Sequence, residues 1–224
     1  MYKFGKMGRS AVVFGATGLI GGHLLQYLLK DPGYRRVTAV VRRPTGIQDS
    51  NFQEVISDFY TIRAVGDKLH GDVYFCCLGS TRKKTPRLGA YYRIDHDYPV
   101  AAAEIAKANA VQTFVLVSAI GANPNSRNFY MKTKGETERD VIKAGIPQTL
   151  IFRPSLLTGR RTENRMLERL ASGVMALANP LLVGKMSRYR SVQARSVAGA
   201  MKKLSEQTFS GTATFYWRDI KTWQ

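Results

Sequence analysis

The chain has 224 residues, enough for one large domain with a substantial buried core. Its composition, 44% hydrophobic and 22% charged, is that of a globular protein and excludes a disordered or fibrous one. A formal net charge of +18 favours anionic partners, such as nucleic acid, acidic lipid surfaces or phosphorylated ligands, without choosing among them.

An apolar run extends from residue 11 to residue 29, with basic residues before it. This pattern imitates a signal peptide or a membrane span. Four glycines, His23 and Gln26 interrupt the run, so a strand, a turn and an amphipathic helix explain it better. We expect no transmembrane segment.

Short β-branched runs alternate with helical patterns up to residue 154. Strands are predicted at residues 11–14, 37–41, 54–56, 72–75, 113–117 and 148–152. Helices are predicted at residues 19–30, 98–108 and 129–144. This alternation predicts an α/β fold, a doubly wound parallel sheet of the Rossmann type.

Beyond residue 154 the strand rhythm fades. Helices are predicted at 161–178 and 191–205 and a last strand at 213–216, while the tail 217–224 is unassigned. No long linker or repeat divides the chain. We therefore treat residues 1–224 as a single domain to which residues 155–224 contribute a small helical substrate cap.

The cysteines, Cys76 and Cys77, are adjacent at the end of an apolar run. Adjacent cysteines do not make a disulfide framework and are normal as buried thiols, so we expect a cytoplasmic protein. Neither they nor the scattered histidines have the spacing of a metal site, and no metal is expected.

A glycine turn joins the first predicted strand to the first helix, with G-x-x-G-x-x-G spacing. Such glycines allow a tight turn, close approach of a pyrophosphate and close helix packing. The spacing alone is a weak signal, because a merely tight turn would use the same residues. The cofactor contacts expected here are Gly15, Thr17, Gly18, Leu19, Ile20 and Gly21.

Arg42 and Arg43 follow the second predicted strand. An NAD-binding protein usually places an acidic residue there for the ribose hydroxyl, whereas a guanidinium pairs with a 2′-phosphate. We therefore expect NADP(H) as the cofactor. The alternative is two solvated surface arginines.

Two more strand ends are candidates for cofactor contact. Asp58, after the third strand, either accepts a hydrogen bond from the adenine amino group or caps the next helix. Leu78 and Gly79 follow the fourth strand, and ligands of such sheets lie beyond the carboxyl ends of the strands.

Ser118, Tyr130 and Lys134 are the predicted catalytic residues. Tyr130 stands four residues before Lys134, which brings both side chains onto one helix face, and Ser118 ends the preceding strand. Reduction of a carbonyl places negative charge on its oxygen, which a proton from Tyr130 and a hydrogen bond from Ser118 would stabilise. The Lys134 ammonium would favour the phenolate of Tyr130 and could hold the nicotinamide ribose. An exposed tyrosine and lysine without a function would show the same spacing.

These residues together resemble the short-chain dehydrogenase/reductase superfamily, in its atypical and extended branch. The segments that carry the resemblance are 15–21, Ser118, 130–134 and 152–154. Segments 75–82, 93–98 and 152–157 are similar to the family of the human HIV Tat-interacting protein and its microbial relatives.

The resemblance implies a Rossmann-fold NADPH binder in which Ser118, Tyr130 and Lys134 are catalytic and the loop with Pro154 and Leu156 lies near the nicotinamide. It implies no substrate. Asp95 stands where many extended members have asparagine, a departure from the usual proton relay.

Three functions are compatible with the sequence. The first is an NADPH-dependent oxidoreductase that reduces a small carbonyl compound with Tyr130 as general acid. A nucleotide-sugar epimerase or dehydratase is the second, since basic residues near the cap could meet an anionic substrate. The third is an NADPH-sensing regulatory protein with little turnover, suggested by the basic segment 81–87. Nucleic acid is a possible partner but is not favoured, because aromatic residues do not interleave that segment. Monomer and homodimer both stay open.

Overall fold

The computed structural model describes residues 8–58, 60–158 and 184–222. Seven strands form one parallel sheet in the order β3-β2-β1-β4-β5-β6-β9. The strands are β1 (Arg9–Phe14), β2 (Tyr34–Val41), β3 (Phe52–Ile56), β4 (Val73–Cys76), β5 (Thr113–Val117), β6 (Gln148–Phe152) and β9 (Gly211–Phe215). The chain runs outward from β1 to β3, returns to β4 and then runs outward the other way, so the sheet is doubly wound and its strand order reverses between β1 and β4.

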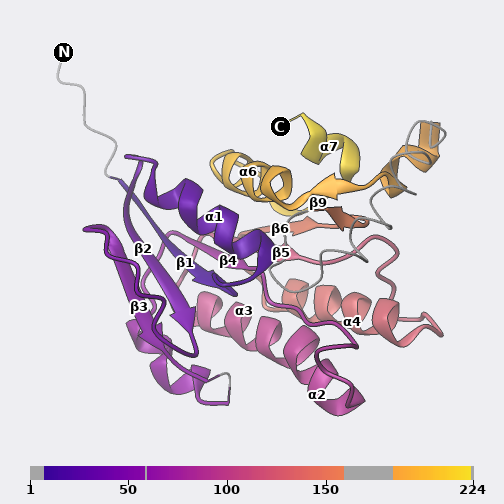
Figure 1. Ribbon diagram of the computed structural model, residues 1–224, viewed down its shortest axis with the longest axis horizontal. Coiled ribbons are helices and arrows are strands. Elements are labelled where there is room, and N and C mark those ends of the chain that lie inside the picture. The colour runs from indigo at the N-terminus through magenta and orange to yellow at the C-terminus, as the bar shows by residue number, and fades with distance from the viewer. Residues whose placement is uncertain (1–7, 59, 159–183, 223–224) are drawn as a thin grey trace.

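Helices cover both faces of the sheet (Figure 1). On one face lie α1 (Leu19–Leu29), α6 (Ala194–Ser205) and the short α7 (Trp217–Lys221). On the other lie α3 (Tyr98–Ala108) and α4 (Phe129–Lys143). The predicted fold class is confirmed.

Alternate strand residues supply the two cores of this three-layer fold. Val13 and Phe75 belong to the core that also contains Leu24 of α1. Val12 and Tyr74, their neighbours in β1 and β4, belong to the core on the α3 side. Since successive strand side chains point to opposite faces, a sheet buried on both sides needs such continuous apolar runs.

Shorter elements connect these layers. They are the 3₁₀ turns η1 (Ile62–Lys68) and η4 (Gly184–Tyr189), α2 (Leu88–Tyr92), the π-helical turn η2 (Arg93–Asp97), and a separate two-strand ladder of β7 (Leu157–Thr158) with β8 (Val192–Gln193). Helix α2, the π turn and α3 follow one another without a break. Within the described ranges, no helix is both long and apolar enough to cross a bilayer.

The predicted strands and three central helices match the structure within a few residues. Helix α6 begins at Ala194 rather than at residue 191, because Val192 and Gln193 pair with β7. The unassigned tail contains α7. The helix predicted at 161–178 lies outside the described residues. Helix α6 and strand β9 join the main layers, and the contribution of residues 155–224 to a substrate cap stays a prediction.

Candidate active site

The carboxyl ends of the parallel strands bring most of the predicted site residues to one edge of the sheet. Gly15 follows β1, Arg42 follows β2, Ser118 follows β5 and Pro154 comes soon after β6. This edge includes the place between β1 and β4 where the strand order reverses, which is where ligands of doubly wound sheets bind.

The turn after β1 has room only for glycine. Gly15 has φ +78°, and a Cβ atom on it would lie 2.8 Å from the carbonyl carbon of Cys77. A Cβ on Gly21 would lie 2.1 Å from the carbonyl oxygen of Gly15, and the N–H of Gly18 donates to that same oxygen over 2.9 Å. The turn therefore holds α1 tightly against the end of β1.

The start of α1 fits a phosphate group. Gly18 is the residue before the helix and gives no side-chain cap, and no acidic residue stands in the first turn. The first N–H groups of a helix lack partners within the helix, and the helix dipole adds partial positive charge there. With the glycines that open the approach, this end of α1 suits a dinucleotide pyrophosphate. Of the predicted contacts, Thr17 is exposed, Leu19 is half-buried and Ile20 belongs to the core.

Arg42 and Arg43 are exposed directly after β2. Neither forms an ion pair with any residue that the structure describes. Asp58 is also exposed, and its Oδ1 accepts from the backbone N–H of Thr61 over 2.9 Å and from the Thr61 hydroxyl over 2.7 Å. Asp58 therefore braces the turn before η1, whose own N-cap residue is Thr61 without a side-chain cap, and the contact with adenine stays a prediction.

Lys134 lies in a buried ion pair with Asp95. The Nζ atom of Lys134 is 2.8 Å from Asp95 Oδ1, and the two side chains are 7% and 1% exposed. The other carboxylate oxygen, Oδ2, accepts from the backbone N–H of Ser80 over 2.7 Å. A Cβ on Gly79 would lie 3.6 Å from Lys134 Nζ, so the loop after β4 passes directly beside the pair.

Tyr130 and Lys134 are brought together, as predicted from their spacing. Burial raises the pKa of Tyr130; the Lys134 charge lowers that pKa and the Asp95 charge raises it, with a net upward shift. Burial lowers the pKa of Lys134, but the Asp95 carboxylate and Tyr130 raise it, again with a net upward shift. Lys134 thus favours the Tyr130 phenolate as expected, but burial and the Asp95 charge raise the pKa of Tyr130 by more than Lys134 lowers it.

Ser118 ends the run of β5 residues and is buried, with 5% exposure. Its backbone N–H donates to the carbonyl oxygen of Phe152 over 2.8 Å. Its hydroxyl has no hydrogen-bond partner among the described residues. A buried hydroxyl without a partner costs free energy unless a ligand or water supplies one, so Ser118 is a candidate ligand contact.

The loop after β6 is tied to the loop after β5. The carbonyl oxygen of buried Pro154 accepts from the N–H of Ile120 over 2.9 Å. Leu156 has 45% exposure, and its carbonyl oxygen accepts from Val192 over 3.0 Å. Pro154 therefore lies close to the end of β5, while the Leu156 side chain is free to meet a ligand.

Sequence reasoning did not find two residues of this cluster. Tyr91 is 1% exposed and its ring meets Tyr130 edge-on, with centroids 6.5 Å apart. Ser80 contributes only its backbone to Asp95. No residue pattern marks a backbone donor, but the two consecutive tyrosines at 91 and 92 on a short helix were a usable signal for Tyr91.

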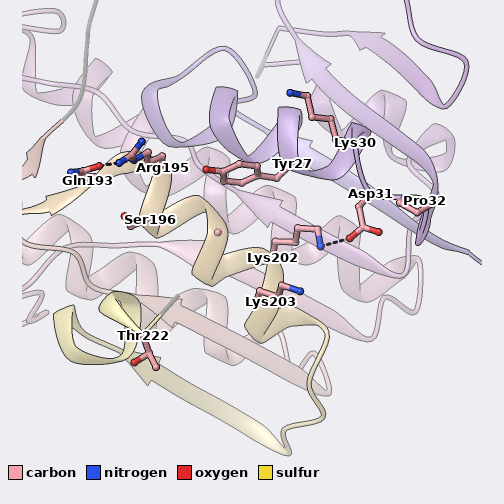
Figure 2. Close-up of a pocket in the computed structure, with 11 residues that line it drawn as sticks. Tyr27, Lys30, Asp31, Pro32, Gln193, Arg195, Ser196, Lys202, Lys203 and Thr222 are labelled. Carbon is pink, nitrogen blue, oxygen red and sulfur yellow. Dashed lines mark hydrogen bonds and ion pairs between the residues drawn. The ribbon is translucent and has the colours of Figure 1, made fainter. Parts of the chain in front are cut away.

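A separate hollow of about 780 Å³ lies between α1 and α6 (Figure 2). Tyr27 lines it from α1, Lys30 lines it from just after that helix, and Lys202 and Lys203 line it from α6. Lys202 Nζ pairs with Asp31 in this hollow, as the dashed line in Figure 2 shows. None of the predicted site residues lines it.

Comparison with known proteins gives the class to which this fold and turn belong. The family model described as NAD(P)H-binding matches residues 15–179, and the chain belongs to that family. It is 38% identical to the mitochondrial protein FMP52 of Saccharomyces cerevisiae, over 70% of this chain and 69% of that protein. It is 34% identical to the protein HTATIP2 of Rattus norvegicus, over 75% of this chain and 71% of that protein. The resemblance found in the sequence is thereby confirmed.

Solved structures of the same fold include sugar-nucleotide enzymes. The enzyme WbmH of Bordetella bronchiseptica, in complex with NAD+, matches with a TM-score of 0.69 over 93% of this chain and 76% of its own, at 17% identity. The UDP-glucose 4-epimerase of Thermotoga maritima matches with a TM-score of 0.65 over 92% and 76%, at 16% identity. At such identities the likeness establishes the fold alone.

One prediction from the sequence is wrong by this comparison. Adjacent buried cysteines led to the expectation of a cytoplasmic protein, but the FMP52 relatives in Saccharomyces cerevisiae, Candida albicans and Kluyveromyces lactis are mitochondrial proteins. Reduced cysteines fit more than one compartment, so they could not decide the location.

Proposed function

We propose that this protein is an NADPH-dependent reductase of a small carbonyl compound. The observation that carries the proposal is the buried Lys134 ammonium beside Tyr130, at the sheet edge that also carries the glycine turn. Burying a charge costs free energy, so buried charges are paired, and they are concentrated at functional sites. Membership of the NAD(P)H-binding family gives the class of cofactor.

The glycine turn and the start of α1 would hold the pyrophosphate, and Arg42 and Arg43 would select the phosphorylated cofactor. Two exposed guanidinium groups that form no ion pair with a described residue can pair with a 2′-phosphate, which NAD(H) lacks. Leu78 and Gly79 would pass beside the cofactor, since Gly79 already lies against Lys134.

Reduced NADP, when bound, supplies the hydride that reaches the carbonyl carbon. The hydroxyl of Tyr130 donates a proton to the carbonyl oxygen as negative charge grows there. The unpartnered hydroxyl of Ser118 donates a hydrogen bond to the same oxygen and stabilises it before the proton arrives. Lys134 holds positive charge next to Tyr130 and can donate to the nicotinamide ribose from the same place.

The test is turnover by three variants with a panel of small aldehydes, ketones and quinones, followed by the absorbance of NADPH. Tyr130→Phe removes the proton donor and keeps the ring, so we expect at least about a hundred-fold loss of kcat with cofactor binding intact. Ser118→Ala should lose about ten- to a hundred-fold. Tyr92→Phe changes a tyrosine next to Tyr91 outside the proposed site and serves as the control. Unchanged turnover by Tyr130→Phe would remove the acid role.

The two alternative functions predict different outcomes in the same assay. An epimerase or dehydratase would convert a nucleotide sugar without net consumption of NADPH, which product analysis detects. An NADPH-sensing protein would bind the cofactor and turn over none of the panel. The basic segment 81–87 motivates the latter, and its exposed side chains Arg82 and Lys83 lie near the proposed cofactor edge.

A further inference from the structure

We propose that Asp95 is a positioning residue of this site. It clamps the Lys134 ammonium to the loop after β4, and its carboxylate balances the Lys134 charge. A neutral Tyr130 hydroxyl then favours reduction of the carbonyl over oxidation of the alcohol. The inference rests on the proposed function, since it concerns the direction in which the same site works.

The clamp is made by both oxygens of one buried carboxylate. Oδ1 lies 2.8 Å from Lys134 Nζ on α4, and Oδ2 accepts from the Ser80 N–H over 2.7 Å in the loop after β4. Asp95 has 1% exposure, so water competes for neither contact. The carboxylate therefore fixes the catalytic helix relative to the loop that would border the cofactor.

The backbone of Asp95 is held from the same helix. Its carbonyl oxygen accepts from the Thr137 hydroxyl over 2.8 Å, one helical turn beyond Lys134. Asp95 lies in the π turn between α2 and α3, and π turns inside helices are frequent at functional sites. An asparagine could accept from Ser80 as well as an aspartate does, so the hydrogen bonds alone do not require the charge that this chain carries.

The charge acts on Tyr130 through Lys134. Among the described residues, the charged groups that act on Tyr130 are Lys134 on α4 and Asp95 in the π turn. Tyr91 on α2 meets the Tyr130 ring, Cys76 on β4 acts on Lys134, and Arg82, in the loop after β4, acts on Tyr91. Cys76 is a neutral buried thiol, since burial raises its pKa to about 12, and burial likewise keeps Tyr91 neutral by raising its pKa. The charges that act on Tyr130 itself are therefore one cation and one anion, which leave no net charge to favour its phenolate.

This balance has opposite effects on the two directions of the reaction. In reduction, the carbonyl carbon gains the hydride from NADPH, the C=O π bond becomes the O–H bond of the alcohol, and Tyr130 gives up its proton and recovers one from solvent. A protonated Tyr130 is ready for that step. In oxidation, Tyr130 must first be a phenolate to take the alcohol proton, which this cluster disfavours until the pH is high.

The experiment is an NMR titration of the protein labelled with ¹³C at the tyrosine ring carbon that bears the hydroxyl. Tyr130→Phe identifies the Tyr130 signal. In the wild-type protein we expect less than half of Tyr130 to be ionised at about pH 10, the ordinary tyrosine value. Asp95→Asn removes the charge and keeps the shape, and it should lower the midpoint by at least about one pH unit.

Asp97→Asn is the matched control, because it makes the same change two residues away in the same turn, on a side chain that is 50% exposed and bonds to His96. It should leave the Tyr130 midpoint unchanged. A wild-type midpoint at or below about pH 10, or an unchanged midpoint in Asp95→Asn, would overturn the inference. If Asp95→Asn does not fold, Asp95→Ser, which also removes the charge, takes its place in the titration, because burial alone would raise the wild-type midpoint.

The titration needs neither cofactor nor substrate, so it separates this inference from the proposed function. Suppose that the Tyr130 midpoint is high and falls in Asp95→Asn, but no carbonyl compound is turned over. This result would support the charge balance and contradict only the reductase activity. Where a carbonyl probe and its alcohol are both turned over, the alkaline limb of the oxidation rate should move to lower pH in Asp95→Asn. A merely structural role of Asp95 would lower both rates without moving that limb.

Discussion

Gly21 packs so closely on Gly15 that a Cβ atom on Gly21 would lie 2.1 Å from the Gly15 carbonyl oxygen. No side chain fits at that distance without movement of the turn. One residue further, a Cβ on Gly22 would lie 3.6 Å from the carbonyl oxygen of Ala16, an ordinary contact. The two adjacent glycines therefore form a matched pair for testing the turn.

Gly21→Ala should destabilise the protein by about 1–3 kcal/mol and abolish stabilisation by NADPH, because α1 must move away from β1. Gly22→Ala should keep NADPH binding and change stability by no more than about 1 kcal/mol, in the stabilising direction, since alanine favours a helix interior. Urea unfolding with and without NADPH measures both. Equal behaviour of the two variants would mean that the turn tolerates a side chain.

Arg153 and Glu138 join the loop after β6 to α4. Arg153 Nε donates to Glu138 Oε1 over 2.8 Å, a second donor, Nη2, bonds to Oε2, and the Glu138 side chain is 7% exposed. Glu138→Gln leaves the guanidinium with a neutral partner and should cost about 2–3 kcal/mol of unfolding free energy.

The control is Glu104→Gln, which breaks an ion pair with Arg63 whose side chains are 46% and 63% exposed. Exposed pairs contribute little, so we expect a change below about 0.5 kcal/mol. A similar cost for both substitutions would show that burial does not strengthen the pair with Arg153.

Acid should weaken the contact between α1 and α6 that runs through Asp31. The hydrogen bond from Lys202 and that from the Gly33 N–H hold the pKa of Asp31 below its ordinary value. A carboxyl whose pKa is lowered by folding stabilises the protein above its unfolded value of about 3.9 and loses this contribution as the pH falls through its folded value. Asp31→Asn should cost about 1 kcal/mol at neutral pH, with the difference from wild type shrinking below about pH 4.

Asp49→Asn tests whether that effect belongs to the ion pair. Asp49 accepts from the Asn51 N–H in a turn, as asparagine also can, and forms no ion pair with another described residue. Its substitution should change stability by less than about 0.5 kcal/mol at every pH. A difference for Asp31→Asn that persists undiminished in acid would argue against the assigned ion pair.

The sheet and its main helices could be predicted from the sequence because their signals are local. β-Branched runs with buried residues on both faces mark the central strands, and Gly15 marks the turn to α1. The π turn at 93–97 leaves no local pattern, and its hydrogen bond from Thr137 comes from a helix distant in the sequence. The two-residue strands β7 and β8 are too short to leave a pattern and form through pairing across the sequence.

The candidate site divides in the same way. The spacing of Tyr130 and Lys134 on one helix predicted that they would lie together. The ion pair of Lys134 with Asp95 could not be read from the sequence, since it requires the π turn to face α4. The sequence left two roles open for Asp58, and the structure gives it hydrogen bonds to Thr61 in the turn before η1 rather than a cap of that helix.

The central claim is that the glycine turn with Arg42 and Arg43 binds NADPH. Thermal unfolding with NADPH, with NADH and without cofactor tests it most directly, in the wild type and in a variant with both arginines changed to alanine. A ligand at about a hundred times its Kd adds about 2.7 kcal/mol, a shift of several degrees for a chain of this size. Arg35→Ala, an exposed arginine at the opposite end of β2, is the control.

We predict a clear rise in Tm with NADPH, little with NADH, and a loss of that preference in the double variant but not in Arg35→Ala. Equal shifts with both cofactors in the wild type would contradict the role of the arginines. The absence of a shift with either cofactor would contradict the proposed function as a whole.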